Sequence, residues 1–456
     1  MEDIKSYLSL IDPRLLHYLS DRNAEFIRIL QSEKFLTEEA FMQRICGEDY
    51  NPKYYRLLKH RVKKILQVLI TVHPEKRAST VKKKFEICQK KFVVGQKLLG
   101  HEDRNEGIRL INQANLEAEK CEITHLASEL SSYLYHDHIY YNRNQKKADF
   151  YAAQVEYYLE AYAAEKKAEK IFYSLIGKES FSIDKKELQI ANKKLKQLNG
   201  NSIKFKVYQF SLKVLYSSNI GAYQFIIGYC DEVLDFFKTR DSVYSSHYHF
   251  FLTQKGMACI ATAQYAIAEE AFNLGMRYTN DRPFNRYLLQ LFQAVNALHA
   301  RQYSRAYLVF QQNRRCRYEA IKEQFVIIEA YLYFLSHLGY LKIDKPFRLG
   351  KYLNDTFKKQ EDKRGDQINI TIAELLVYLI RDKAKFIDRI EAVKTYSYRH
   401  LRAHEYERAK WFIKILCTLP RANFNPVALQ RLAKKPIEML ENHPIRMGEN
   451  FAIEII

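Results

Sequence analysis

The stretch GMACIATAQYAIAEEAFNLG, residues 256–275, carries small and aromatic side chains at fixed intervals. Counted from Gly256, Tyr265 lies nine residues further along the chain, Ala268 twelve, Phe272 sixteen and Gly275 nineteen. Such spacing is typical of two helices joined by a short turn, because small residues let the two helices approach closely. We expect Gly256 and Ala268 at the crossing, with Phe272 beside it and Tyr265 closing the turn. Gly275 would leave room for the first helix of the next pair.

The same spacing recurs further along the chain. One copy consists of Ala294, Tyr303, Ala306, Phe310 and Asn313, and another of Ser397, Tyr406, Ala409, Ile413 and Leu416. A weaker copy consists of Gly95, Arg104, Gly107, Ile111 and Ala114. Because a single helix pair cannot bury its apolar faces alone, neighbouring pairs must stack on one another. The sequence therefore predicts an array of stacked helix pairs.

This spacing resembles the tetratricopeptide repeat (TPR), a helix–turn–helix unit of about 34 residues. The interval from Gly256 to Ala294 is slightly longer than one such unit, and the interval from Ala294 to Ser397 is close to three units. The resemblance implies a right-handed α-solenoid over residues 79–456, with a groove that binds a peptide or a partner helix. The alternative is an irregular helical bundle in which the small residues recur by chance.

The composition also points to an all-α protein. The 456 residues include only 14 Gly and 9 Pro, so residues that interrupt helices are scarce. The sequence has no long runs of β-branched residues with period two that end in hairpin turns. The 34 Tyr side chains, each apolar with one polar tip, suit half-buried positions on stacked helices.

Cysteine usage and hydropathy predict a cytoplasmic location. The seven Cys form no C-x-x-C pair, which favours free thiols in a reducing compartment. The N-terminal residues lack the basic and then apolar pattern of a signal peptide. No stretch of about 18 residues is apolar and free of charge, so we expect no transmembrane helix.

The net charge of +20 is concentrated in one part of the chain. From Lys53 to Lys97 there are 14 Lys and Arg but only 2 Asp and Glu, a balance of +12. Such a concentration favours an acidic partner, which could be nucleic acid, an anionic membrane surface or an acidic protein.

Residues 1–78 lack the repeat spacing and are expected to form a separate helical segment. Within it, NPKYYRLLKHRVKKILQVLI (residues 51–70) is typical of an amphipathic helix that Asn51 caps and Pro52 begins. Its expected apolar face consists of Tyr55, Leu58, Val62, Ile65, Leu66 and Leu69.

The wider stretch LTEEAFMQRICGEDYNPKYYRLLKHRVKKIL (residues 36–66) resembles part of the winged-helix DNA-binding domain of two-component response regulators. The resemblance implies that residues 51–66 are a recognition helix whose cations face phosphates or base edges. The candidate residues for binding nucleic acid or an acidic partner are Lys53, Arg56, Lys59, Lys63, Lys64, Lys82, Lys83 and Lys84. Two alternatives remain open: a capping helix pair with a solvated basic side, and a docking site for an acidic protein.

The sequence contains no motif that carries catalysis. It lacks a G-x-G-x-x-G or P-loop phosphate cradle, a G-x-S-x-G elbow and an H-E-x-x-H zinc motif. His136 and His138 are two residues apart, so they would point to different faces of a helix. We therefore expect no metal and no cofactor. The expected function is a non-catalytic protein interaction scaffold, and the alternative is a nucleic-acid-binding regulator in which the repeats act as a sensor.

Overall fold

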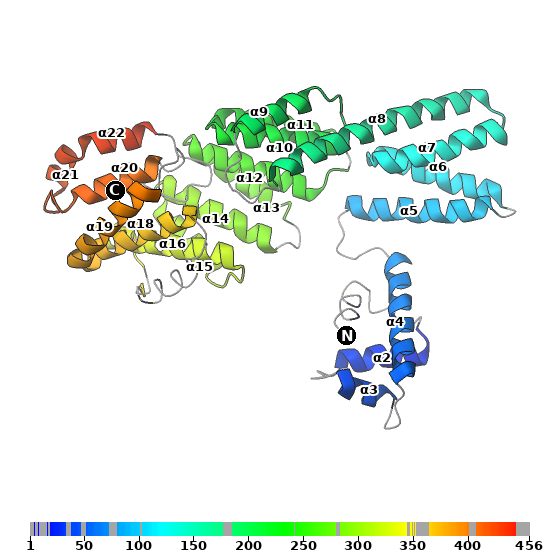
Figure 1. Cartoon of the computed structure of the whole chain (residues 1–456), viewed down its shortest axis with the longest axis horizontal. Helices are drawn as coiled ribbons and strands as arrows, with labels where there is room; N and C mark the ends of the chain where they lie inside the picture. Colours follow the sequence, from blue (N-terminus) through cyan, green and yellow to red (C-terminus); the bar gives the residue numbers. More distant parts are fainter. Residues whose placement is uncertain are drawn as a thin grey trace. The chain divides into compact units, whose positions relative to one another are not determined.

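The prediction of an all-α protein is confirmed by the computed structural model. The structure describes residues 4, 8, 16, 19–32, 38–46, 52–72, 80–100, 103–176, 185–240, 242–279, 283–343, 347–348, 350, 352, 364–400 and 407–443. Within these residues there are 20 α-helices and no strand (Figure 1). In the same part of the chain, none of the helices is long and apolar enough to cross a membrane.

The chain divides into two compact units. The first unit consists of residues 1–166 with the short segments 200–203 and 240–244, and the second consists of the remaining residues. The helices from the N-terminus to the boundary are α2 (Asp21–Ser32), α3 (Glu38–Cys46), α4 (Pro52–Val72), α5 (Thr80–Leu99), α6 (Arg104–Lys120), α7 (Thr124–Tyr140) and α8 (Gln145–Ile176), which continues into the second unit.

Among its described residues, the first unit has two separate hydrophobic cores. The more N-terminal core lies between α2, α3 and α4, where Phe26 meets Phe41 edge to face with ring centroids 5.0 Å apart and stacks on Tyr55 at 6.3 Å. The predicted apolar face of α4 packs into it, and of the six residues only Ile65 is half-buried. The other core starts at Phe85 and lies between α5, α6, α7 and α8. The predicted boundary between residues 78 and 79 lies outside the described residues.

The second unit consists of helices that follow one another with short turns. They are α9 (Lys185–Lys196), α10 (Ile203–Asn219), α11 (Tyr223–Lys238), α12 (Ser245–Ala261), α13 (Tyr265–Met276), α14 (Pro283–His299), α15 (Tyr303–Asn313), α16 (Glu319–His337), α18 (Arg364–Arg381), α19 (Lys383–His400), α20 (Glu407–Thr418), α21 (Pro426–Leu432) and α22 (Lys434–Asn442). Each helix from α11 to α16 packs against the next, and α12 also contacts α14, as α14 contacts α16 (Figure 1). The C-terminal helices α16 to α22 share one continuous core.

One turn geometry recurs in the second unit, at a constant interval from Ala263 to Gly339, whereas the same geometry at Gly221 lies at a longer interval before Ala263. Ala263, Arg301 and Gly339 have left-handed backbone angles, with φ of 56°, 58° and 84°, and they are equally spaced along the chain. The next amide bonds back across the turn: Gln264 N–H donates to the Cys259 carbonyl and Gln302 N–H to the Ala297 carbonyl, both at 2.8 Å. This is the Schellman ending of a helix, which satisfies carbonyls that the helix leaves open. Because the residue after Gln264 or Gln302 already begins the next helix, each turn reverses the chain within a few residues.

Candidate functional site

Gly256 of α12 lies against the ring of Phe272 in α13. A Cβ atom on Gly256 would overlap the ring, with the Phe272 Cζ only 2.6 Å away. The ring is fully buried, so no space remains at this point between the two helices. Phe272 and Gly256 therefore seal the α12–α13 pair.

The other residues of this first copy lie on the same pair. Ala268 is fully buried in α13, and Tyr265 is the first residue of that helix, half-buried, with its ring stacked on His299 of α14. Gly275 faces the next pair, because a Cβ on it would lie 3.3 Å from Cδ1 of Leu289 in α14. The backbone of α13 thus comes close to α14.

The second copy repeats these positions on α14 and α15, and the third lies on α19 and α20. Ala294, Ala306 and Phe310 are buried, and Tyr303 begins α15 in a half-buried position. Of the third copy, Ser397 is half-buried on α19 and Ala409 is buried on α20, whereas Tyr406 lies outside the described residues. The weaker copy also has a tight crossing, since a Cβ on Gly95 of α5 would lie 2.9 Å from the carbonyl oxygen of Gly107 in α6.

Helix α4 carries the basic residues expected to contact nucleic acid. Lys53, Arg56 and Lys64 are exposed, and Lys59 and Lys63 are half-buried. Its opposite side is buried in the α2–α3–α4 core, so the cations lie on the solvent side of an amphipathic helix. The capping residue proposed for this helix, Asn51, lies outside the described residues, and Pro52 is the first helical residue.

Helix α5 carries the three further candidate lysines near its start. Lys82 is exposed, and Lys83 and Lys84 are half-buried. Lys84 is paired with Glu117 of α6, with Nζ 3.1 Å from Oε1. At least one of the three lysines is therefore paired with a carboxylate of the first unit.

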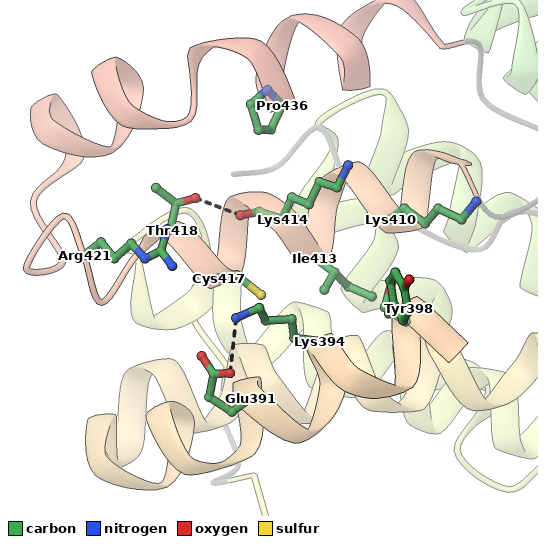
Figure 2. Close-up of a pocket in the computed structure, with 11 residues that line it drawn as sticks. Glu391, Lys394, Tyr398, Lys410, Ile413, Lys414, Cys417, Thr418, Arg421 and Pro436 are labelled. Atoms are coloured by element: carbon green, nitrogen blue, oxygen red, sulfur yellow. Dashed lines mark hydrogen bonds and ion pairs between the residues drawn. The ribbon is translucent and has the colours of Figure 1, made fainter. Parts of the chain in front are cut away.

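A pocket of about 660 Å³ opens between α19, α20 and α22 in the second unit (Figure 2). Its lining consists of Glu391, Lys394, Ser397 and Tyr398 from α19, Lys410, Ile413, Lys414, Cys417 and Thr418 from α20, Arg421 from the turn after α20, and Pro436 from α22. In Figure 2 the α20 residues lie between those of α19 and Pro436 of α22. We call this cavity the α20 pocket. Its volume is within the range of about 300–1,000 Å³ that is typical of ligand sites.

Cations dominate the α20 pocket. Four of its residues are Lys or Arg, and a single carboxylate, Glu391, faces them. Lys394 pairs with Glu391 at 3.3 Å, and Lys410 pairs with Glu407 outside the pocket at 3.7 Å. The Lys414 Nζ instead lies 3.7 Å from the ring centroid of Trp411, a cation–π contact. The pocket is therefore electropositive.

The inner wall of the α20 pocket is apolar and chemically inert. Ile413 is almost fully buried, and burial raises the pKa of the Cys417 thiol to about 11, with Glu391 acting in the same direction and Lys394 and Arg421 against it. At neutral pH this thiol therefore stays protonated and is a poor nucleophile. The pocket therefore offers charge and apolar contact.

A buried arginine holds α22, the third side of the α20 pocket, against α20. Arg408 of α20 is 5% exposed and donates hydrogen bonds to the carbonyl oxygens of Leu440, at 3.0 Å, and His443. Both carbonyls lie at the C-terminal end of α22, where helix carbonyls lack partners and a cation is favoured. The shape of the pocket thus depends on a residue that does not line it.

The cations of the α20 pocket were not among the site residues predicted from the sequence. One signal was present: the third copy has Ile413 where the first has Phe272 and the second Phe310, and Lys410 and Lys414 flank it. An aliphatic residue at this position does not by itself indicate a pocket, because Ile111 of the weaker copy is fully buried against Gly95.

Within the described residues, no three His, Cys, Asp or Glu side chains lie close enough together to hold a metal ion. Comparison of the chain with protein-family models, with curated proteins and with solved structures finds no match.

Proposed function

We propose that this protein is a non-catalytic interaction scaffold in the cytoplasm. Its helices α10 to α22 would form a right-handed solenoid of TPR-like pairs, and the solenoid groove would bind a peptide or a partner helix. The observation that carries the proposal is the regular repetition in the second unit. The same left-handed turn recurs at equal intervals from Ala263 through Arg301 to Gly339, and small residues such as Gly256 and Gly275 lie at helix contacts beside it.

The contacts between helices support a groove on one side of the array. The first helices of successive pairs touch one another, α12 with α14 and α14 with α16. First helices that lie this close together are expected to line the inner, concave surface of a solenoid, where an extended partner meets several pairs at once.

Site-specific cross-linking of the full chain tests the scaffold function. A photo-reactive side chain would be placed in turn at three exposed positions on first helices, Phe250, Arg286 and Lys322, and at Ile267 and Leu308 on second helices. We expect first-helix positions to label a discrete protein partner in cell extract, and second-helix positions to label it weakly. Equal labelling from both sets, or no adduct from any position, would contradict the proposal.

A second candidate function is nucleic-acid binding by α4, favoured by the exposed cations Lys53, Arg56 and Lys64 opposite its buried face. A full-length variant with Arg56→Glu and Lys64→Glu should bind a mixed-sequence DNA duplex about tenfold more weakly or worse at ~50 mM salt, because phosphate contacts dominate such affinity. The unchanged protein should lose affinity steeply between ~50 and ~200 mM salt. Equal affinity of the variant and the unchanged protein would exclude α4 as the contact.

A further inference from the structure

The α20 pocket has more positive charge than its own residues neutralise. Glu391 and Glu407 pair with Lys394 and Lys410, respectively. Among the described residues, Lys414 and Arg421 have no carboxylate within ion-pair distance. A ligand that brings two or more negative charges would therefore meet cations that are available to pair with it.

The cations of the pocket follow the length of α20. Lys410 and Lys414 are four residues apart, about 6 Å along the helix axis, and the uncharged Thr418, four residues further on, extends the polar row to about 12 Å. Arg421, in the following turn, extends the row beyond the helix end. A compact anion such as phosphate would reach only part of this row. An extended peptide, at about 3.3 Å per residue, covers it with four or five residues.

Apolar surface lies between the cations. Ile413 and Cys417 come from the same stretch of α20, and Pro436 faces them from α22. The ring of Tyr398, which is 81% exposed, lies at α19 on the other side. An extended peptide directs alternate side chains to opposite sides, so acidic residues can pair with the cations while the side chains between them meet apolar atoms.

We infer that the α20 pocket binds a short, extended acidic segment of a partner protein, in which carboxylates pair with Lys414 and Arg421 while an apolar side chain packs on Cys417 and Pro436 beside Ile413. The inference rests on the proposed scaffold function and names the chemistry of one partner segment. The single Trp of the chain, Trp411, contacts Lys414 and so reports on occupation of this pocket by its fluorescence.

Binding of a defined peptide to the full chain tests the inference. The probe is a fluorescein-labelled peptide of about seven residues with blocked termini, in which Glu and Leu alternate. The matched probe carries Gln in place of Glu. Probe anisotropy measures affinity, and the Trp411 emission, recorded with unlabelled peptide, shows whether the α20 pocket is the site. We expect the Glu peptide to bind and to change the Trp411 emission at ~50 mM salt, and the Gln peptide to do neither.

Charge reversal identifies the residues that carry binding. The variant Lys414→Glu with Arg421→Glu should lose about tenfold or more in affinity for the Glu peptide, since two attractive contacts become repulsive. The matched control, Lys194→Glu with Arg277→Glu, changes the net charge equally at exposed positions outside the pocket and should stay within about twofold. Because all four side chains are exposed, both variants should keep the helicity of the unchanged protein.

Three outcomes would overturn the inference. They are equal binding of the Glu and Gln peptides, an unchanged affinity after reversal of Lys414 and Arg421, and a loss of duplex DNA affinity in that variant without a loss of peptide affinity. The scaffold function is judged separately by cross-linking. If the reversed variant still labels the same partner from Phe250, Arg286 or Lys322, the scaffold stands and the pocket assignment fails. If no position labels a partner, the scaffold function itself fails.

Discussion

The pairs α12–α13 and α19–α20 share one spacing of residues but differ at the crossing. In the first pair Gly256 faces Phe272, whose ring fills the space between the helices completely. In the second pair the corresponding residues are Ser397 and Ile413, and both line a cavity of about 660 Å³. This position of the repeat is aromatic in the sealed pair and aliphatic beside the pocket, although the aliphatic Ile111 of the weaker copy is fully buried against Gly95 in a tight crossing.

In the proposed array, this difference would let one helix pair carry a binding site while the framework of helix contacts stays the same. The positions that set the helix contacts remain small or apolar in both pairs, so both pairs still pack. The pocket lies beside Ile413, where neighbouring positions, Lys410 and Lys414 among them, provide charge. The most informative tests are therefore substitutions that disturb the closed α12–α13 crossing or that fill the α20 pocket.

The largest effect is expected from Ala268→Arg in the sealed pair. Ala268 is fully buried, so a long charged side chain must either lose its hydration or push α13 away. We expect the free energy of unfolding to fall by about 3–5 kcal/mol, measured by urea denaturation. Ala266→Arg, at an exposed position on the same helix, is the matched control and should change it by less than about 0.5 kcal/mol. An unchanged urea midpoint for Ala268→Arg would contradict the packing of α13.

Gly256→Ala should have the next largest effect. The new Cβ overlaps the Phe272 ring, and we expect a loss of about 1–3 kcal/mol although Ala is the better helix former. In combination with Phe272→Leu the loss should be smaller than the sum of the two single losses by at least about 0.5 kcal/mol.

Gly228→Ala in α11 is the control for that substitution. A Cβ at Gly228 meets no atom within 4 Å, so this change should raise the free energy of unfolding by up to about 1 kcal/mol. Equal destabilisation by Gly228→Ala and Gly256→Ala in thermal or urea unfolding would show that the Phe272 contact is not the cause.

Ile413→Phe should fill part of the α20 pocket, as Phe272 fills the space between α12 and α13. The larger ring has the pocket volume to enter, so we expect a stability change below about 1.5 kcal/mol. Affinity for the alternating Glu–Leu peptide should fall about tenfold, because the apolar wall that receives its Leu side chains is covered. Ile413→Leu keeps the volume and should leave the affinity within about twofold. Peptide titration of both variants, followed by Trp411 emission, measures the two affinities. Undiminished binding by Ile413→Phe would show that the peptide binds outside the α20 pocket.

The smallest effect is expected in the turns that the pairs share. Arg301 has a left-handed backbone that costs an L-residue about 1–2 kcal/mol, and Arg301→Gly should recover about 0.5–1 kcal/mol after its greater flexibility in the unfolded chain is subtracted. Gly339→Ala, the reverse change at φ 84°, should lose a similar amount. Opposite shifts of the urea midpoint would support the shared geometry, and shifts of the same sign would contradict it.

The helix contacts were accessible from the sequence because their determinants are local. Gly256, Phe272 and Gly275 lie within one helix pair and its neighbour, so a fixed spacing records them. The turns were harder to predict, because Ala263 and Arg301 adopt a left-handed conformation that is usually occupied by Gly. For the α20 pocket, the sequence shows only that Lys410 and Lys414 flank the repeat position Ile413. The shape of the pocket could not be derived, since it depends on Arg408 of α20 binding the carbonyls of Leu440 and His443 at the far end of α22. No periodicity of the sequence records a contact of that kind.

The recurring left-handed turn has a consequence for how such a chain can change in length. Since the turn at Ala263 and the turn at Arg301 have nearly the same backbone conformation, the segment 264–301 begins and ends in equivalent surroundings. After a tandem duplication of that segment, the chain would continue from the end of the inserted copy in the same direction as before. The inserted helix pair would then pack against an equivalent pair on each side. In the proposed array, copying within a gene would add one unit in a single event and leave the α20 pocket, which lies C-terminal to the copied segment, unchanged.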